Sequence, residues 1–330
     1  MKHSALTVLV CPVCKATLDA EIAVLEGHEI LDGTLVCSFC RARYPIRGGV
    51  PRFVPDGLYA NSFGRQWAWF RTVQLDSETG TSRSDDALRG ATGWSDDQYR
   101  GRRLLDAGVG AGRFAERAAA KGAEVFGVDL TTAVDAAYRN IGERAGVHLI
   151  QADIFALPFR ADTFDLAYSI GVLHHTPDPA NAFRHVAEVV RPEGRLAVFL
   201  YSRYGFAHRM SDVIRRVSTR LPLGIMWVLS ALAVPLYYLY RVPILGAIGN
   251  LALPISMERH WRWRWLDTFD WYTPKYQFKY LYPEIIRWYQ ESGFHELEIF
   301  GDPIRMSGQK RRIREMSDGR QPRWRNLVAS

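Results

Sequence analysis

A glycine-rich turn follows an apolar segment in the first half of the chain. Residues 104–114 read Leu-Leu-Asp-Ala-Gly-Val-Gly-Ala-Gly-Arg-Phe. Glycine has no Cβ atom, so such a turn lets the backbone approach a ligand closely. Asp129 closes the next apolar segment, 124–130, where a carboxylate can accept hydrogen bonds from both ribose hydroxyls of a nucleoside. The pattern predicts a nucleoside-binding site at the carboxyl ends of two neighbouring parallel strands.

The spacing of the glycines distinguishes two classes of nucleoside cofactor. Dinucleotide-binding turns follow G-x-G-x-x-G, with a small third residue where the helix packs on the strand. Counted from Gly108, that third position is Arg113, which is long and charged. The glycines instead form G-x-G-x-G after Asp106, and this arrangement resembles motif I of class I S-adenosylmethionine (SAM) methyltransferases. A plain strand-to-helix connection is the alternative interpretation.

Later segments extend the resemblance in the expected order. A predicted strand over 147–151 leads to Asp153 and Ile154, and a predicted strand over 164–169 leads to Gly171. In this family the acid after the third strand takes the adenine amino group, and its apolar neighbour packs on the ring. The resemblance therefore implies SAM as the cofactor. The implied contact residues are Asp106, Ala107, Gly108, Gly110, Gly112, Asp129, Leu130, Asp153, Ile154, Ser169 and Gly171.

The segment 102–201 as a whole resembles the type 11 methyltransferases, a group that includes the quinone and sterol enzymes. The family implies an α/β, Rossmann-like sheet of seven strands with one reversed strand. Residues 281–310 are expected to complete this core. The other predicted elements are a helix over 179–191, a fifth strand over 196–201, a helix over 282–292 and an antiparallel pair over 294–300 and 304–309.

All four cysteines lie near the N-terminus, in two Cys-x-x-Cys pairs separated by 22 residues. Each pair can supply two thiolates to one tetrahedral zinc ion, with bonds of about 2.3 Å. Disulfides, which are typical of secreted chains, are the alternative. Because protein atoms fill every ligand position, we expect a structural Zn²⁺ site and not a catalytic one. The predicted ligands are Cys11, Cys14, Cys37 and Cys40.

The run after the second cysteine pair reads Tyr-Pro-Ile-Arg-Gly-Gly-Val-Pro-Arg-Phe over 44–53. With the cysteines it resembles the zinc-ribbon family that activates tRNA and release-factor methyltransferases as a separate subunit. The ribbon, predicted over 1–56, is here fused in front of its methyltransferase. The resemblance implies a docking or stabilising role without chemistry of its own.

A predicted helical linker over 57–101 joins the ribbon to the core. Phe63, Trp67 and Phe70 fall on one helix face. We expect this face to pack into the core, and a lid over the cofactor is the alternative.

An insertion, 202–280, separates the fifth predicted strand from the final helix, and a connection of this length is normally functional. Its centre, 221–240, contains no charged residue and meets the length criterion of about 20 residues for a membrane span. Pro222 and Pro235 oppose one regular span. We expect apolar helices that cap the active site and contact a membrane peripherally through 203–254. A simple cap or dimer surface and a spanning helix are the alternatives.

Two further segments bear on what the protein binds. Trp and Arg alternate over 261–265, which predicts an extended strand with one residue type on each face. Interleaved aromatic and basic side chains can stack on nucleic acid or anchor at a membrane interface. The formal net charge is +7, and much of the excess lies in the basic tail, 311–330. Such a tail is usually a solvated end and sometimes a polyanion or anionic-lipid contact.

Two adjacent histidines follow the fourth predicted strand, at the edge where cofactor and substrate meet in this fold. Methyl transfer to a hydroxyl requires an aligned acceptor and removal of its proton. An imidazole, with an ordinary pKa near 6.5, suits that second task. His175, and after it His174, are therefore the predicted general bases, with structural packing as the alternative for either ring. Asp267, Asp270 and Tyr272 of the insertion are the other candidates.

The apolar insertion favours a small-molecule acceptor, specifically a hydroxyl of a glycan, a lipid-linked molecule or an isoprenoid-like molecule. Methylation of an RNA base is the second hypothesis, because the tail and the Trp-Arg run are basic. A non-catalytic adaptor that binds SAM is the third. Residues 1–10 lack the apolar run of a signal peptide, so we expect a cytoplasmic protein, peripheral on the inner face of the membrane.

Overall fold

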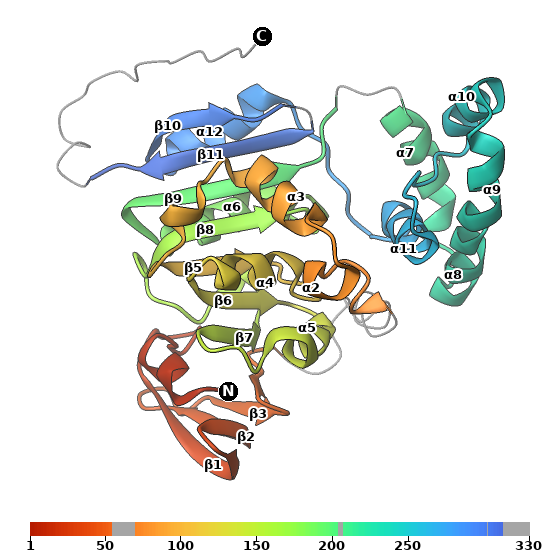
Figure 1. Ribbon diagram of the computed structural model, residues 1–330. Helices are drawn as coiled ribbons and strands as arrows, with labels where there is room; N and C mark the ends of the chain where they lie inside the picture. Colours follow the sequence, from red (N-terminus) through yellow and green to blue (C-terminus); the bar gives the residue numbers. More distant parts are fainter. Residues whose placement is uncertain (55–69, 204–206, 302, 313–330) are drawn as a thin grey trace.

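The computed structural model describes residues 1–54, 70–203, 207–301 and 303–312. Two sheets organise these residues, and a group of helices stands at one end of the larger sheet (Figure 1). Most of the predicted linker face, including Phe63 and Trp67, and the tail from 313 onward lie outside the described residues.

The N-terminal sheet is antiparallel, with its four strands in sequence order β1-β2-β3-β4. A 3-10 helix, η1, precedes it. The hairpin between the first two strands turns at Gly27, whose φ of +57° is accessible to glycine at little cost. The elements are η1 (His3–Thr7), β1 (Leu18–Glu26), β2 (Glu29–Cys37), β3 (Arg43–Arg47) and β4 (Val50–Pro51).

The larger sheet has seven strands in the order β10-β11-β9-β8-β5-β6-β7, and the strand β11 runs antiparallel to both of its neighbours. The predicted α/β sheet with one reversed strand is therefore confirmed. Helices cover both faces of this sheet, so the side chains of its central strands are mostly apolar and buried. The strands are β5 (Arg103–Ala107), β6 (Glu124–Asp129), β7 (Val147–Gln151), β8 (Phe164–Ile170), β9 (Val190–Leu200), β10 (Phe294–Ile299) and β11 (Ile304–Lys310).

Helices on the two faces close the core. Among them, α6 ends at Glu188, three residues before the predicted boundary, and β9 begins at Val190, before the predicted fifth strand. The sequence Pro192-Glu193-Gly194 lies inside β9 at an irregularity where Glu193 has a φ of +65°. The elements around the core are α2 (Asp76–Thr79), α3 (Arg83–Thr92), η2 (Asp96–Gln98), α4 (Arg113–Ala120), α5 (Ala133–Ile141), η3 (Ile154–Ala156), η4 (Leu173–His175), α6 (Pro179–Glu188) and α12 (Tyr282–Glu291).

The insertion is helical, as expected, and stands beyond the carboxyl ends of the parallel strands (Figure 1). The strand predicted over 261–265 is wrong, because these residues begin a helix. The side chains of Trp263, Leu266, Phe269 and Tyr272 are buried, and their spacing of three fits a helix and not a strand. The elements are α7 (Ala207–Ser218), α8 (Leu223–Ala231), α9 (Ala233–Tyr240), α10 (Pro243–Ala252) and α11 (Trp261–Tyr272).

The N-terminal sheet docks on the outermost parallel strand of the core, β7. Arg52 pairs with Gln151 as a parallel bridge, and the Phe53 amide donates a 2.8 Å hydrogen bond to the Gln151 carbonyl. The side chains of Leu9 and Ile30 belong to the same buried apolar cluster as Phe159 of the core. An exposed strand edge invites unwanted pairing, and the ribbon covers this one.

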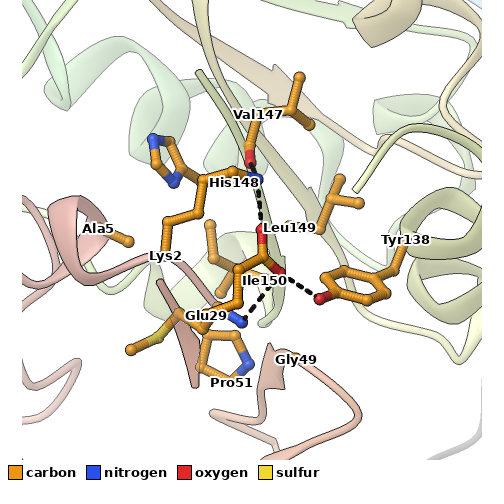
Figure 2. A pocket seen from close by; sticks show the side chains of 11 residues that line it. Lys2, Ala5, Glu29, Gly49, Pro51, Tyr138, Val147, His148, Leu149 and Ile150 are labelled. Carbon is orange, nitrogen blue, oxygen red and sulfur yellow. Dashed lines mark hydrogen bonds and ion pairs between the residues drawn. The ribbon is translucent and has the colours of Figure 1, made fainter. Parts of the chain in front are cut away.

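A close contact in this interface depends on Gly49. Figure 2 shows the Tyr138 ring facing Gly49, with the Tyr138 hydroxyl donating a hydrogen bond of 2.5 Å to Glu29. Gly49 has a φ of +78°, and a Cβ atom there would lie 2.2 Å from the Tyr138 hydroxyl oxygen. The cavity between the two parts, lined also by Lys2 and His148, measures about 10 Å³, room for roughly one water molecule. A cavity of this size has no room for an organic ligand.

We expect the substitution Gly49→Ala to loosen the ribbon from the core. The neighbouring Gly48→Ala is the matched control, since Gly48 also has a positive φ but a Cβ atom added there would have no neighbour within 4 Å. Urea unfolding should show Gly49→Ala to be less stable than Gly48→Ala by about 1–3 kcal/mol. Equal stability of the two variants would show that the Tyr138 contact does not hold the parts together.

Candidate functional site

The glycine turn connects β5 to α4 with a left-handed backbone at each glycine. The φ angles of Gly108, Gly110 and Gly112 are +102°, +53° and +93°, a region that other residues adopt only with strain. A Cβ atom on Gly108 would lie 2.2 Å from the Val172 side chain, and one on Gly112 would lie 2.8 Å from Ile141. The turn packs closely on the loop after β8 and on α5, and this packing requires glycine at positions 108 and 112.

Asp129 fixes the turn from the end of β6. Its carboxylate accepts hydrogen bonds from the Gly110 amide (2.9 Å), the Thr131 amide (2.9 Å) and the Thr131 hydroxyl (2.8 Å). Burial raises the pKa of this carboxyl, and the three hydrogen bonds oppose that rise. Asp129 is only half-buried, and an ionised carboxylate has about four lone-pair positions. It can hold the turn and still accept from a ligand's hydroxyl groups.

The polar groups of the residues beneath the turn form hydrogen bonds within the protein. Asp106 is buried, and its carboxylate accepts a 3.0 Å hydrogen bond from the Tyr168 hydroxyl. Burial raises the pKa of Asp106 to about 7. The Ser169 hydroxyl, with no exposed surface, donates to the carbonyl of buried Ala107 at 2.8 Å. Asp106, Ala107 and Ser169 therefore shape the floor of the predicted SAM site.

The remaining predicted cofactor residues line the same edge of the sheet. Asp153 is half-buried, and its carboxylate caps η3 by accepting from the Phe155 amide at 3.0 Å. Ile154 is buried, and the Leu130 carbonyl accepts from the Gln151 side chain at 3.0 Å. Gly171, with a φ of +78°, turns the chain after β8. Half-buried carboxylates and main-chain groups in this row suit the sugar and base of a nucleoside.

The predicted histidines lie beside one another on η4. His174 has no exposed surface, and it stacks on Tyr201 with ring centroids 4.1 Å apart. Neither of its ring nitrogens has a hydrogen-bond partner among the described residues. Burial lowers the pKa of His174 well below its usual value, and the neighbouring His175 and Arg215 lower it further. We therefore expect this ring to be neutral at neutral pH.

His175, unlike His174, is oriented by a main-chain contact. Its Nδ1 lies 2.8 Å from the Tyr276 carbonyl oxygen, which can only accept, so the ring proton belongs on Nδ1 and the lone pair on Nε2. Burial lowers the pKa of His175 to about 4. The ring is therefore neutral at neutral pH, with Nε2 as its basic nitrogen.

Helix α11 brings Asp267 to the glycine turn. The Arg113 guanidinium lies 4.5 Å from the Phe114 ring centroid and 5.3 Å from that of Trp263 on α11. Burial lowers the pKa of Arg113 to about 10, and the charge of Asp267 opposes this change. Burial raises the pKa of Asp267 to about 7, which the charge of Arg113 opposes. The insertion thus forms one wall of the site.

The other two candidates of the insertion, Asp270 and Tyr272, lie in different surroundings. Burial raises the pKa of Tyr201, the tyrosine that stacks on His174, and the nearby negative charge of Asp270 raises it further. Tyr272 is buried with Met226 and Phe269, and its hydroxyl donates to the Pro254 carbonyl at 2.6 Å. The fold therefore places Asp270 near Tyr201, whose ring contacts both histidines, and packs Tyr272 within the insertion.

Three residues of this region were not among the predicted site residues, namely Arg113, Tyr201 and Arg215. The buried Arg215 donates to the carbonyls of Trp271 (3.0 Å) and Pro274 (2.5 Å), which anchors the end of α11. Arg113 carries the clearest sequence signal, because it is a long cation directly after the last glycine of the turn. Arg215 and Tyr201 had no local signal, since their neighbours come from distant segments.

The four cysteines converge, as the spacing predicted. Their sulfur atoms all lie within 4.8 Å of one another. The Sγ atoms of Cys11 and Cys40 are 3.6 Å apart, and those of Cys14 and Cys37 are 3.4 Å apart. A tetrahedral ion with bonds of about 2.3 Å would separate its sulfur ligands by about 3.8 Å. The donor set and its spacing fit a zinc ion.

Comparison with known proteins divides the chain in the same way. Residues 105–198 match the family described as methyltransferase domain, and residues 2–49 match the family described as Trm112p-like protein. Both resemblances drawn from the motifs are confirmed. The chain is 37% identical over 100 residues to the ubiquinone biosynthesis O-methyltransferase of Aromatoleum aromaticum, covering 29% of this chain and 42% of that protein.

Other relatives show the same limited span. An uncharacterized protein of Mycobacterium tuberculosis is 35% identical over 134 residues, or 38% of this chain and 48% of that protein. The chain thus spans less than half of the length of these curated relatives. A solved complex containing the Haloferax volcanii Trm112 methyltransferase activator aligns with 76% of this chain and 98% of that chain, at 14% identity and a TM-score of 0.45. The fold assignment rests on the strand order and not on this alignment.

Proposed function

We propose that this chain, in which residues 105–198 form a methyltransferase domain, transfers a methyl group from SAM to a hydroxyl of a small-molecule acceptor. The observation that carries the proposal is the Asp129 carboxylate, hydrogen-bonded to the Gly110 amide at the carboxyl edge of the sheet. SAM, when bound, supplies a methyl group already activated by its sulfonium. The chain's own residues then have to bind the nucleoside, align the acceptor and accept a proton.

The binding roles follow from position. Asp129 accepts hydrogen bonds from the ribose hydroxyls, and Asp153 accepts from the adenine amino group while Ile154 covers the ring. The glycine turn brings main-chain atoms close to the ligand, and its path against Val172 and Ile141 depends on the absence of a Cβ atom at Gly108 and Gly112. Asp106 keeps the turn in shape through Tyr168.

The acceptor site lies between η4 and α11. His175 accepts the hydroxyl proton at Nε2, because the Tyr276 carbonyl holds the proton of the neutral ring on Nδ1. Arg113 and Asp267 orient polar groups of the acceptor from the opposite wall. The surroundings are aromatic and buried, with His174 stacked on Tyr201. This environment supports an acceptor with a large apolar part, such as a lipid-linked or isoprenoid-like molecule, over a free glycan.

The ribbon is proposed to hold Zn²⁺ through its four thiolates and to act as a built-in support for the core. The ion would supply the folding energy that a small apolar core cannot, on the order of 10–16 kcal/mol in zinc-finger peptides. The support acts on β7, whose free edge the ribbon covers through Arg52 and Phe53.

Titration calorimetry with SAM tests the cofactor site. We expect Asp129→Ala to weaken binding at least ~10-fold, because it removes the acceptor of the ribose hydroxyls and of the Gly110 amide. Asp19→Ala, an exposed carboxylate on the ribbon, is the control and should bind as the wild type does. Equal affinity of Asp129→Ala and the wild type at unchanged thermal stability would contradict the proposed site.

Transfer of label from methyl-labelled SAM to a cell extract tests the reaction. We expect the label in the lipid-soluble fraction, and we expect His175→Gln to reduce transfer by at least ~100-fold while SAM affinity is retained, since the base is lost. The exposed His28→Gln is the control. Label that is released by ribonuclease would support RNA methylation instead. SAM binding without any transfer would support the adaptor hypothesis.

Removal of the metal tests the ribbon. We expect one zinc per chain by elemental analysis, and after chelation we expect faster amide exchange in β1–β4 and also in β7, because the cover of its edge is lost. Cys14→Ser should reproduce the effect, whereas Ser38→Ala, between the ligands of the second pair, should not. A metal-free protein with native exchange rates in β7 would refute this role.

A further inference from the structure

The outer helices of the insertion expose an unusual amount of apolar side-chain surface. On α8, Val228 is 66% exposed, and on α10 Ile244 and Ile248 are 74% and 61% exposed. Large exposed apolar patches on a folded protein mark an interaction site. The proposed transfer reaction does not use this surface, which leaves its occupant to be identified.

One side of these helices packs on the protein and the other does not. Met226, Ser230 and Ala233 are buried at positions four and three apart, against α11 and its neighbours. The 18 residues of Leu223–Tyr240 have a mean hydropathy of 1.7, yet only 17% of them are buried. A core helix with this composition would be mostly buried, so the exposed side is suited to a nonpolar medium.

The segment is better suited to lie on a membrane than to cross one. Eighteen helical residues extend about 27 Å, short of a hydrocarbon core of about 30 Å. After Arg241 the chain turns back into α10, which contacts both α9 and α7. The helices therefore form a folded layer on the protein, with both ends of the layer anchored in the same domain.

The charges around this layer specify the kind of membrane. Residues 221–257 contain a single charged side chain, Arg241, and no acid. Exposed arginines lie within this segment and on both sides of it in the sequence, and Trp261, 49% exposed, lies between Arg259 and Arg262. Amphipathic rings and cations are the groups that settle at the headgroup level of anionic leaflets. The exposed arginines are Arg216, Arg220, Arg241, Arg259 and Arg262.

We propose that α8, α9 and α10 form a docking surface for an anionic lipid bilayer, with their exposed apolar side chains inserted among the headgroups. A second copy of the chain is a poorer occupant, because a two-fold interface through these helices would bring Arg241 and the flanking arginines of the two copies together. Helix α11 separates this surface from the glycine turn, since it contacts α8 and α9 and carries Trp263 against Arg113. If the proposed function holds, an acceptor anchored in the leaflet lies one helix diameter, about 10 Å, from the site.

Co-sedimentation with vesicles tests the docking surface on the full chain. We expect binding to vesicles that contain about one third phosphatidylglycerol and at least ~10-fold weaker binding to pure phosphatidylcholine. The double variant Ile244→Glu with Ile248→Glu should lose binding to the anionic vesicles at least ~10-fold, because it places two carboxylates on the inserted face. Its affinity for SAM should stay at the wild-type value, which separates this test from that of the proposed function.

The control variant introduces two glutamates at exposed apolar positions of the ribbon. Ile22 and Leu25 on β1 are 44% and 52% exposed, and Ile22→Glu with Leu25→Glu should bind vesicles as the wild type does. Equal vesicle binding by the α10 variant and the wild type would overturn the proposal. A wild type that does not bind vesicles but sediments as a dimer, with the α10 variant monomeric, would overturn it in favour of a second copy.

Discussion

The contact on which the rest of the site depends is the hydrogen bond from the Gly110 amide to the Asp129 carboxylate. It joins the turn after β5 to the end of β6 at 2.9 Å. The turn can take this path only because Gly108 and Gly112 leave no Cβ atom against Val172 and Ile141. A single carboxylate thus sets the position of the backbone that a nucleoside would approach, and stays half-exposed for the ligand.

The two appended parts contact different sides of the same sheet. The ribbon covers the free edge of β7 and shares a buried apolar cluster with the core. The insertion lies over the carboxyl ends of the strands, where α11 supplies Asp267 and Asp270. The first part covers a strand edge, and the second places side chains at the end of the sheet where the glycine turn lies. The two additions therefore contact the core in different places.

Burial weakens the charges of the site in a consistent direction. It raises the pKa of Asp106 and Asp267 to about 7, and it lowers the pKa of Arg113 to about 10 and that of His175 to about 4. Removal of these groups from water disfavours their charged forms. At neutral pH this leaves His175 neutral and the two carboxyls partly protonated, while Arg113 keeps its charge. An environment of reduced charge is compatible with the apolar acceptor proposed above. The apolar outer layer of the insertion is in keeping with such an acceptor.

The sequence by itself determined the features that depend on neighbouring residues. Such features are the glycine turn, the acid closing β6 and the two Cys-x-x-Cys pairs. In each of them the functional groups are close together in the chain, so their spacing was sufficient to predict the kind of site.

Only the tertiary structure decided which distant groups meet. The Trp-Arg alternation over 261–265 resembled a strand locally, but burial of one side against α8 made it a helix. Arg113 and Trp263, far apart in the chain, meet because α11 packs over the turn, and the same packing brings the charge of Asp267 near Arg113. Tyr272, on that same helix, faces the insertion instead. Side-chain direction on a helix changes by about 100° per residue, so the packing of α11 fixed which of its residues reach the site.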